Sequence, residues 1–142
     1  MDEERRARNL EVIEQFRAGG GRPPGEFFER QPLLLLHHVG AKSGAAYISP
    51  LAYLPDGDGR WVLFAANGAR QNRPGWYYNL LANPETVIEV GTRTERVRSR
   101  EVHGAERKAY FERQLRVTEV LGQFEQTKQR EIPVLLLERI VE

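Results

Sequence analysis

The sequence predicts a mainly β domain of the α+β class, in which six antiparallel strands form a closed or half-closed barrel with flanking helices. Short apolar runs bounded by turn residues recur from Pro32 to the end of the chain, and such runs are typical of strands. The turns between the first three runs are too short for a parallel crossover, so these strands must be antiparallel. Six strands in 142 residues favour a barrel, because closure removes exposed sheet edges.

The chain begins with a charged segment, residues 2–18, that we expect to be a helix. Leu10, Ile13 and Phe16 recur at roughly helical spacing, and the glycines and prolines of residues 19–25 end the segment in a flexible joint. We therefore divide the chain into a helix with its joint (1–25) and a barrel domain (26–142). The helix could cap the domain, cover a pocket or rest on a membrane surface. Three large apolar residues are few for lipid contact, so capping is favoured.

Strands, turns and two further helices follow in order. Gly40–Gly44 is the first turn, and Pro55–Gly59 is a hairpin turn, because glycine accepts positive φ and proline presets the first corner. The expected strands are residues 33–39, 47–54, 60–66, 86–90, 94–102 and 132–140. The expected helices are residues 75–82, which stop before Asn83-Pro84, and residues 105–129.

Composition argues against several classes of function. The 21 basic and 20 acidic side chains nearly cancel, whereas nucleic-acid binders usually carry a basic excess, so no nucleic-acid partner is expected. The absence of cysteine removes disulfides and thiolate chemistry. The longest apolar run is too short to span a bilayer, and the charged N-terminus is not a secretory signal. We expect a cytoplasmic protein, with at most peripheral membrane contact through the first helix.

The histidines and serines do not predict metal or hydrolase chemistry. His37 and His38 are adjacent on a strand, so they face opposite sides and cannot chelate one ion together. His103 stands alone in a turn, and no carboxylate follows at a metal-ligand spacing. The serines, which are Ser43, Ser49 and Ser99, lack the context of a nucleophile elbow.

The turn between the first two strands is a candidate anion site. Gly40 and Gly44 bracket Lys42 and Ser43, and backbone amides in such a turn can form a nest for an anion. Lys42 would supply the point charge and Ser43 a hydroxyl donor. A plain hairpin with a solvated lysine explains the same residues equally well.

A second candidate segment runs from Ala65 to Leu80. The small residues Ala65 and Ala66 at the end of a strand would let a flat ring approach the backbone. Trp76 offers an aromatic wall, and Asn79 offers an amide that both donates and accepts hydrogen bonds. Trp76 could equally plug the end of the barrel.

Four motifs together resemble a known family. LLLLHHVGAKSG, SPLAYLPDGDG, RPGWYYNLLANPETVIEVG and REIPVLLLE occur in this order over about residues 30–139. In order and spacing they resemble the deazaflavin-dependent nitroreductase and quinone reductase family. The resemblance implies a split β-barrel that binds coenzyme F420, a deazaflavin with a phosphorylated, oligoglutamylated tail. It also implies hydride transfer to a quinone, a nitroaromatic compound or an activated enone.

The resemblance assigns roles to residues of this chain. The turn from Ala41 to Ala46 would hold the phosphate and tail, with Lys42 as the main cation. The implied cofactor-binding residues are Ala41, Lys42, Ser43, Gly44, Pro50, Ala65, Ala66, Asn67, Gly75, Trp76, Tyr77 and Asn79. The substrate would stack against Trp76, Thr118, Leu121 and Phe124.

This chain departs from the family pattern at two places. Many relatives carry basic residues where it has Ala41 and Tyr47, so its tail pocket is less cationic than expected. The late helix lacks the tyrosines that members of the family place over the substrate. The proton that follows the hydride would then come from Tyr47, Tyr53, Tyr77 or solvent.

Alternative functions remain open at this point. The same barrel could bind FMN or FAD with another hydride donor, or hold a fatty acid or a tetrapyrrole without catalysis. A membrane-associated role of the first helix is a further alternative. The sequence does not choose between a monomer and a homodimer.

Overall fold

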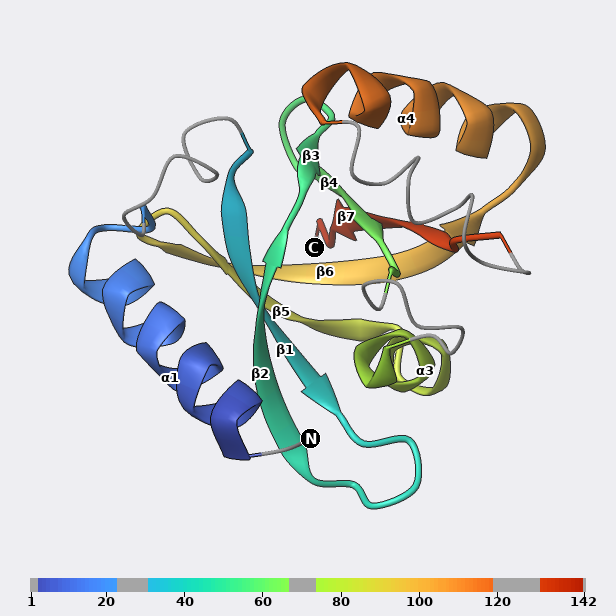
Figure 1. Ribbon diagram of the computed structural model, residues 1–142. Coiled ribbons are helices and arrows are strands. Elements are labelled where there is room, and N and C mark those ends of the chain that lie inside the picture. The colour runs from blue at the N-terminus through green and yellow to red at the C-terminus, as the bar shows by residue number, and fades with distance from the viewer. Residues whose placement is uncertain (1–2, 23–30, 67–73, 119–130, 142) are drawn as a thin grey trace.

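A curled, seven-stranded antiparallel sheet forms the body of the protein, with helices on its surfaces (Figure 1). The computed structural model describes residues 3–22, 31–66, 74–118 and 131–141. The strands are β1 (Leu33–Val39), β2 (Ala46–Ala52), β3 (Leu54–Pro55), β4 (Arg60–Phe64), β5 (Glu85–Val90), β6 (Arg93–Val102) and β7 (Val134–Arg139). The described helices are α1 (Glu3–Ala18), α3 (Gly75–Ala82) and α4 (Gly104–Val117).

The order of the strands explains why the barrel is split. The order across the sheet is β2-β1-β5-β6-β7-β4-β3, and all printed pairings are antiparallel. The two edge strands, β2 and β3, follow each other directly in the chain. Tyr53 lies between them, and its amide donates to the carbonyl of Pro32 over 3.0 Å. The chain therefore crosses at Tyr53 from one edge of the sheet to the other, and this is where the barrel is split.

The predicted mainly β fold is confirmed, with one correction to the strand count. The sequence predicted one strand over residues 47–54, but the structure divides this segment into β2 and β3. The first part pairs with β1 and the second part pairs with β4. A single extended segment that serves two sheet edges looks continuous in sequence, so seven strands appear where six were expected.

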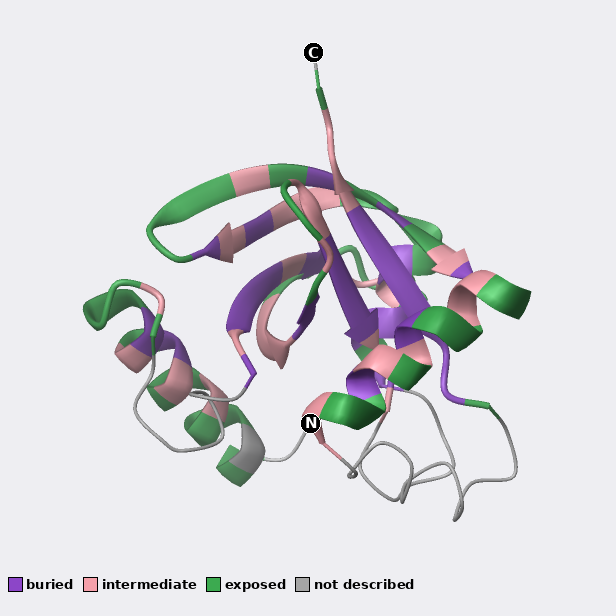
Figure 2. Cartoon of the chain, turned by 90° about the horizontal axis from the view of Figure 1, so that it is seen from above, coloured by how far each residue is buried: buried purple, intermediate pink, exposed green. Residues whose placement is uncertain are grey.

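The core fills the inside of the curled sheet. Leu34, Leu36, Leu63 and Ile88 are fully buried there, and α3 closes one end of the barrel with Trp76, Tyr77 and Leu80. In Figure 2 the buried residues lie mostly on the strands at the centre of the molecule, whereas exposed residues lie mostly on the helices and turns around them. β1 is buried on both faces, which explains why LLLL reads as a continuous apolar run.

The first helix packs on the outer face of β1. Ile13 and Phe16 bury their side chains against Leu33 and Leu35, while Leu10 is 55% exposed. This arrangement agrees with a capping role. The joint that was predicted after the helix is described only as far as Arg22. The division of the chain at residue 25 and contact with a membrane surface stay predictions.

A second outer layer is formed by α4. Its Tyr110 packs against Leu54, Val62 and Leu136 on the opposite face of the sheet from the barrel core. The predicted helix over 105–129 is confirmed to Val117, and Thr118 is its C-cap. The remainder of that prediction lies outside the described residues.

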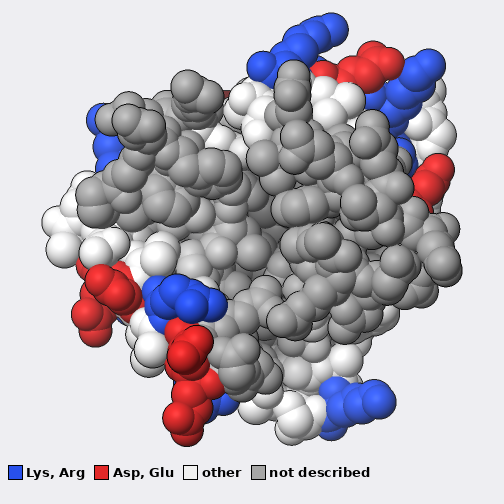
Figure 3. Space-filling view, in the orientation of Figure 1, with Lys and Arg blue, Asp and Glu red and all other residues white. Residues whose placement is uncertain are grey.

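On the face drawn in Figure 3, described basic and acidic side chains lie interspersed at the periphery and do not form a patch of one sign. None of the described helices is long and apolar enough to cross a membrane.

Candidate functional site

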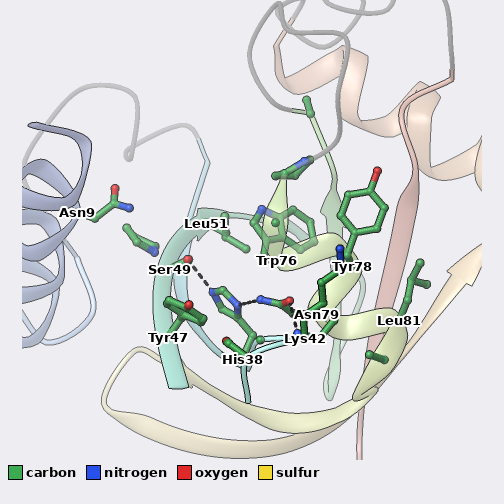
Figure 4. Close-up of a pocket in the computed structure, with 18 residues that line it drawn as sticks. Asn9, His38, Lys42, Tyr47, Ser49, Leu51, Trp76, Tyr78, Asn79 and Leu81 are labelled. Atoms are coloured by element: carbon green, nitrogen blue, oxygen red, sulfur yellow. Dashed lines mark hydrogen bonds between the residues drawn. The ribbon is translucent and has the colours of Figure 1, made fainter. Parts of the chain in front are cut away.

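A cleft of about 1180 Å³ lies where the β1–β2 hairpin meets α3 (Figure 4). Both segments singled out in the sequence contribute to it, although they are more than twenty residues apart. Its lining residues are Asn9, His38, Gly40, Ala41, Lys42, Ser43, Tyr47, Ser49, Pro50, Leu51, Ala66, Pro74, Gly75, Trp76, Tyr78, Asn79, Leu81 and Ala82.

The β1–β2 turn forms the polar wall of the cleft. Gly44 has a φ of +72°, a conformation that glycine adopts without strain, and its amide donates to the carbonyl of Gly40 over 3.0 Å. A Cβ at Gly40 would meet the Ser43 hydroxyl, so a larger residue there would require the Ser43 side chain to move. The Lys42 side chain lies on the cleft.

The backbone amides of this turn are only partly available to an anion. The amide of Ala45 donates to Ser43 Oγ over 3.2 Å, and that of Ala41 donates to Asn79 Oδ1 over 2.9 Å. Within the described part of the chain, the amides of Lys42 and Ser43 have no such acceptor. The expected nest is thus reduced to two amides beside one ammonium group.

A hydrogen-bonded chain of side chains links the turn to the floor of the cleft. Asn79 Nδ2 donates to His38 Nδ1 over 2.9 Å, and His38 Nε2 lies 2.8 Å from Ser49 Oγ. The orientation of the Asn79 amide is fixed, because its oxygen accepts from the amide of Ala41. His38 Nδ1 must then be the acceptor and Nε2 the protonated nitrogen.

The electrostatics of His38 agree with this hydrogen-bond pattern. The side chain is 8% exposed, and burial together with the neighbouring His37 lowers its pKa to about 4. Because burial disfavours the charged form, the imidazole is neutral at physiological pH. Tyr47 stacks on this ring, with 5.5 Å between ring centroids and 23° between planes.

The helix α3 supplies the aromatic wall. Trp76 is buried on the barrel side of the cleft, near Leu51, whereas Tyr78 and Leu81 are exposed at its outer margin. Pro74, in an extended conformation, is the N-cap residue from which the helix begins. Trp76 and Leu51 therefore give the cleft an apolar wall, in addition to the polar wall formed by the turn that carries Lys42.

Most of the residues that the resemblance implied for cofactor binding lie on the cleft. Those that line it are Ala41, Lys42, Ser43, Pro50, Ala66, Gly75, Trp76 and Asn79. Gly44, Ala65 and Tyr77 do not line it, since Gly44 only shapes the turn and the other two belong to the barrel core. Asn67 lies outside the described residues.

The candidate proton donors and substrate wall are only partly brought to the cleft. Tyr47 lines it, whereas Tyr53 is buried in the core, where burial raises its pKa. The Tyr77 hydroxyl donates to Glu101 on β6. Thr118 does not line the cleft, so of the described residues expected in the substrate wall only Trp76 does. Leu121 and Phe124 lie outside the described residues.

Several lining residues were missed from the sequence. From the sequence alone, His38 is a candidate only for metal binding and Ser49 only for nucleophilic catalysis. Strand alternation and pairing give a usable signal, because His38, Tyr47 and Ser49 share one face of the β1–β2 hairpin. Tyr78 and Leu81 could not be found in this way, because their exposure depends on how α3 docks. The described residues contain no cluster that could hold a metal ion.

Comparison with known proteins identifies the family. The family model described as F420H(2)-dependent quinone reductase matches residues 8–139. This chain belongs to that family. It is 34% identical over 106 residues to Rv3178 of Mycobacterium tuberculosis, a protein named for the same family, with 75% of this chain and 88% of the relative covered.

Longer relatives and solved structures agree with this membership. Rv1261c of Mycobacterium tuberculosis, named F420H(2)-dependent quinone reductase, is 43% identical over 72 residues, and the match spans 51% of this chain and 45% of that protein. The structure titled F420-H2 dependent reductase (FDR-A) has a TM-score of 0.68 and 28% identity, over 75% of this chain and 94% of that one. A structure titled domain-swapped dimer has a TM-score of 0.71 and 25% identity, over 95% and 97%.

Membership of this family confirms the predicted enzyme class and cofactor. The chain is an oxidoreductase of the F420H2-dependent type, and coenzyme F420 is its implied cofactor. The alternatives that were left open, an FMN or FAD enzyme and a non-catalytic binder, are not favoured.

Proposed function

We propose that the cleft between the β1–β2 turn and α3 binds F420H2 and presents it to a quinone. The observation that carries this proposal is the meeting of Lys42 and Trp76 on one cleft, in a chain of the F420H(2)-dependent quinone reductase family. A cation and an aromatic wall on one cleft match a cofactor with an anionic tail and a planar ring.

The residues present fit such a cofactor. Pockets for ligands of this kind usually measure about 300–1,000 Å³, so a cleft of about 1180 Å³ has room for a cofactor and part of an acceptor. The amides of Lys42 and Ser43 and the Lys42 ammonium group are the donors offered to a phosphate. Pro50, Leu51 and Trp76 offer apolar contact to a ring.

The protein contributes binding and orientation more than covalent chemistry. When bound, F420H2 supplies the hydride. Trp76 and Pro50 would fix the plane of the ring, and the apolar walls would exclude water from the reacting atoms. Of the three candidate proton donors, Tyr47 alone lines the cleft, so we assign it the proton that follows the hydride, with solvent as the other source.

Tyr47→Phe tests this role of the tyrosine. Phenylalanine keeps the stacking on His38 but removes the hydroxyl, so we expect turnover to fall about 10- to 100-fold while F420 affinity stays within about twofold. Tyr78→Phe is the matched control, because Tyr78 also lines the cleft but was not assigned a proton. Stopped-flow rates in both variants check the prediction, and equal rates would leave solvent as the donor.

The acceptor is proposed to be a planar quinone that enters beside α3. Tyr78 and Leu81 are exposed there and offer apolar contact at the margin of the cleft. The test is anaerobic oxidation of F420H2 by purified protein after addition of a naphthoquinone. We expect oxidation that requires both protein and quinone, and no reaction with NADPH as donor. A rate equal to that without protein would contradict the proposal.

A homodimer is proposed as the assembly. The neighbour titled domain-swapped dimer covers almost the whole of this chain, which supports this proposal. Light scattering after size-exclusion chromatography should give twice the mass of one chain at micromolar concentration, and a single-chain mass would contradict it.

A further inference from the structure

The hydrogen-bonded chain beneath the cleft has a direction. It starts at the amide of Ala41, which can only donate, and runs through Asn79 to His38 and then to Ser49. Each step fixes the next, because an amide oxygen accepts and an amide nitrogen donates. His38 Nε2 therefore carries the proton and donates it toward Ser49 Oγ.

The Ser49 hydroxyl is thereby left with a proton to donate. It accepts from His38, and among the described residues it has no other hydrogen-bond partner. Ser49 lies on the face of β2 that lines the cleft, next to Pro50. In Figure 4 the chain from Asn79 through His38 to Ser49 is drawn below Leu51 and Trp76.

We propose that Ser49 is a ligand-binding residue whose hydroxyl proton is aimed into the cleft at an acceptor atom of the bound ring, a carbonyl oxygen or an unprotonated ring nitrogen. His38 and Asn79 are positioning residues in this assignment. The inference rests on the proposed function, since it takes the ring to be that of F420.

The hydrogen-bonded chain of side chains orients the Ser49 hydroxyl but does not supply a proton to the ligand. If Ser49 gave up its proton, the neutral His38 would have to replace it from Nε2 and become an imidazolate, because Asn79 donates to Nδ1 and takes no proton. The amide and the backbone N–H at the far end are not acids under these conditions. Ser49 therefore discriminates between ligands by their acceptor atoms.

One substitution reverses the donor-to-acceptor direction of the hydrogen bonds from Asn79 through His38 to Ser49. In Asn79→Asp, both carboxylate oxygens accept, so the amide of Ala41 keeps its partner while His38 must present a proton at Nδ1. In the neutral imidazole, His38 Nε2 then becomes an acceptor, and the Ser49 hydroxyl turns to it and away from the ligand. Because the new carboxylate raises the pKa of the ring, the comparison is made at a pH above that pKa. The side chains of Ser49 and His38 remain unchanged in this variant.

A double-mutant cycle in F420 binding, followed by fluorescence, tests the assignment. We expect Ser49→Ala to weaken binding about 3- to 10-fold in the wild-type background and less than about twofold in the Asn79→Asp background. Any general effect of the new charge beside Lys42 cancels in this comparison. Ser49→Thr should retain wild-type affinity, and Ser99→Ala, on β6 and away from the cleft, is the matched control.

Nitrogen chemical shifts of the His38 ring give a readout that does not depend on the ligand. Wild-type protein should show a protonated Nε2 and Asn79→Asp a protonated Nδ1. The inference would be overturned if Ser49→Ala lowered F420 affinity equally in both backgrounds or did not lower it in the wild-type background. A protonated Nδ1 in wild-type protein would also overturn it. If wild-type protein binds no F420 at all, the proposed function fails as well, which is a distinguishable result.

Discussion

His38 is a buried histidine whose charge state is tied to the integrity of the cleft. Its neutral form accepts from Asn79 and donates to Ser49, and protonation at Nδ1 would set two donors against each other. The neighbouring groups are Tyr47, stacked on the ring, and His37, which faces the other side of β1. His38 therefore links the pH of the solution to the geometry of the polar wall.

This linkage predicts how the free energy of unfolding depends on pH. The pKa of His38 is lowered from 6.5 to about 4, so the unfolded chain takes up a proton at higher pH than the folded one. The stabilising contribution of the neutral His38 to the free energy of unfolding is fully present above about pH 6.5 and is lost as the pH falls toward 4. The loss should reach about 3 kcal/mol in urea denaturation, since one pKa unit is worth about 1.4 kcal/mol.

The contribution of His38 is isolated by a matched pair of variants. Glu89 and Asp56 also have lowered pKa values and lose stabilising interactions in acid, so wild-type curves alone are not decisive. His38→Gln should abolish about 3 kcal/mol of the pH dependence between 6.5 and 4, whereas His103→Gln, at an exposed position, should not. Identical pH profiles for all three proteins would show that His38 is not a buried neutral group.

The N-terminal helix is held to the barrel by both apolar and charged contacts. Phe16 is 1% exposed against Leu33 and Leu35, and Arg17 donates to both oxygens of Glu89 on β5. His37 Nε2 lies 2.7 Å from the same carboxylate. Burial of the aromatic ring contributes most, because the Arg17 side chain is half exposed and ion pairs of this kind are weak.

Substitution of one helix residue tests this attachment. Phe16→Ala should lower the free energy of unfolding by about 3–4 kcal/mol, the usual cost of removing a buried phenyl ring. Leu10→Ala, on the same helix but exposed, should change it by less than about 0.5 kcal/mol. Chemical denaturation of both variants checks the difference, and equal effects would contradict the packing of α1 as a cap.

The ranges of the strands and helices were predicted from sequence more accurately than the pairing of the strands and the packing of the helices. β1 and α3 match their predicted ranges, because apolar runs bounded by glycine and proline report local structure directly. The division of β2 from β3 at Tyr53 could not be predicted, since it depends on which sheet edge each half meets. The face of α3 that covers the cleft also follows from packing and not from local pattern.

Curling of the sheet places the β1–β2 turn and the segment from Ala65 to Leu80 on one cleft. β2 carries Tyr47 and Ser49, and α3 follows β4 at the opposite end of the sheet order, yet both border the same space. The turn and the tryptophan could be proposed from motifs, because their residue types suit an anion and a ring. The polar chain through His38 could not, because it requires the distances between three separate elements.

Equilibrium titration of the purified protein with F420 decides whether Lys42 holds the cofactor in this cleft. We expect F420 to bind more tightly than FMN, FAD or haem, Lys42→Ala to weaken F420 binding about tenfold, and Lys108→Ala, on α4 and away from the cleft, to leave it unchanged. Equal affinity of wild-type protein and Lys42→Ala for F420 would show that Lys42 does not hold the cofactor.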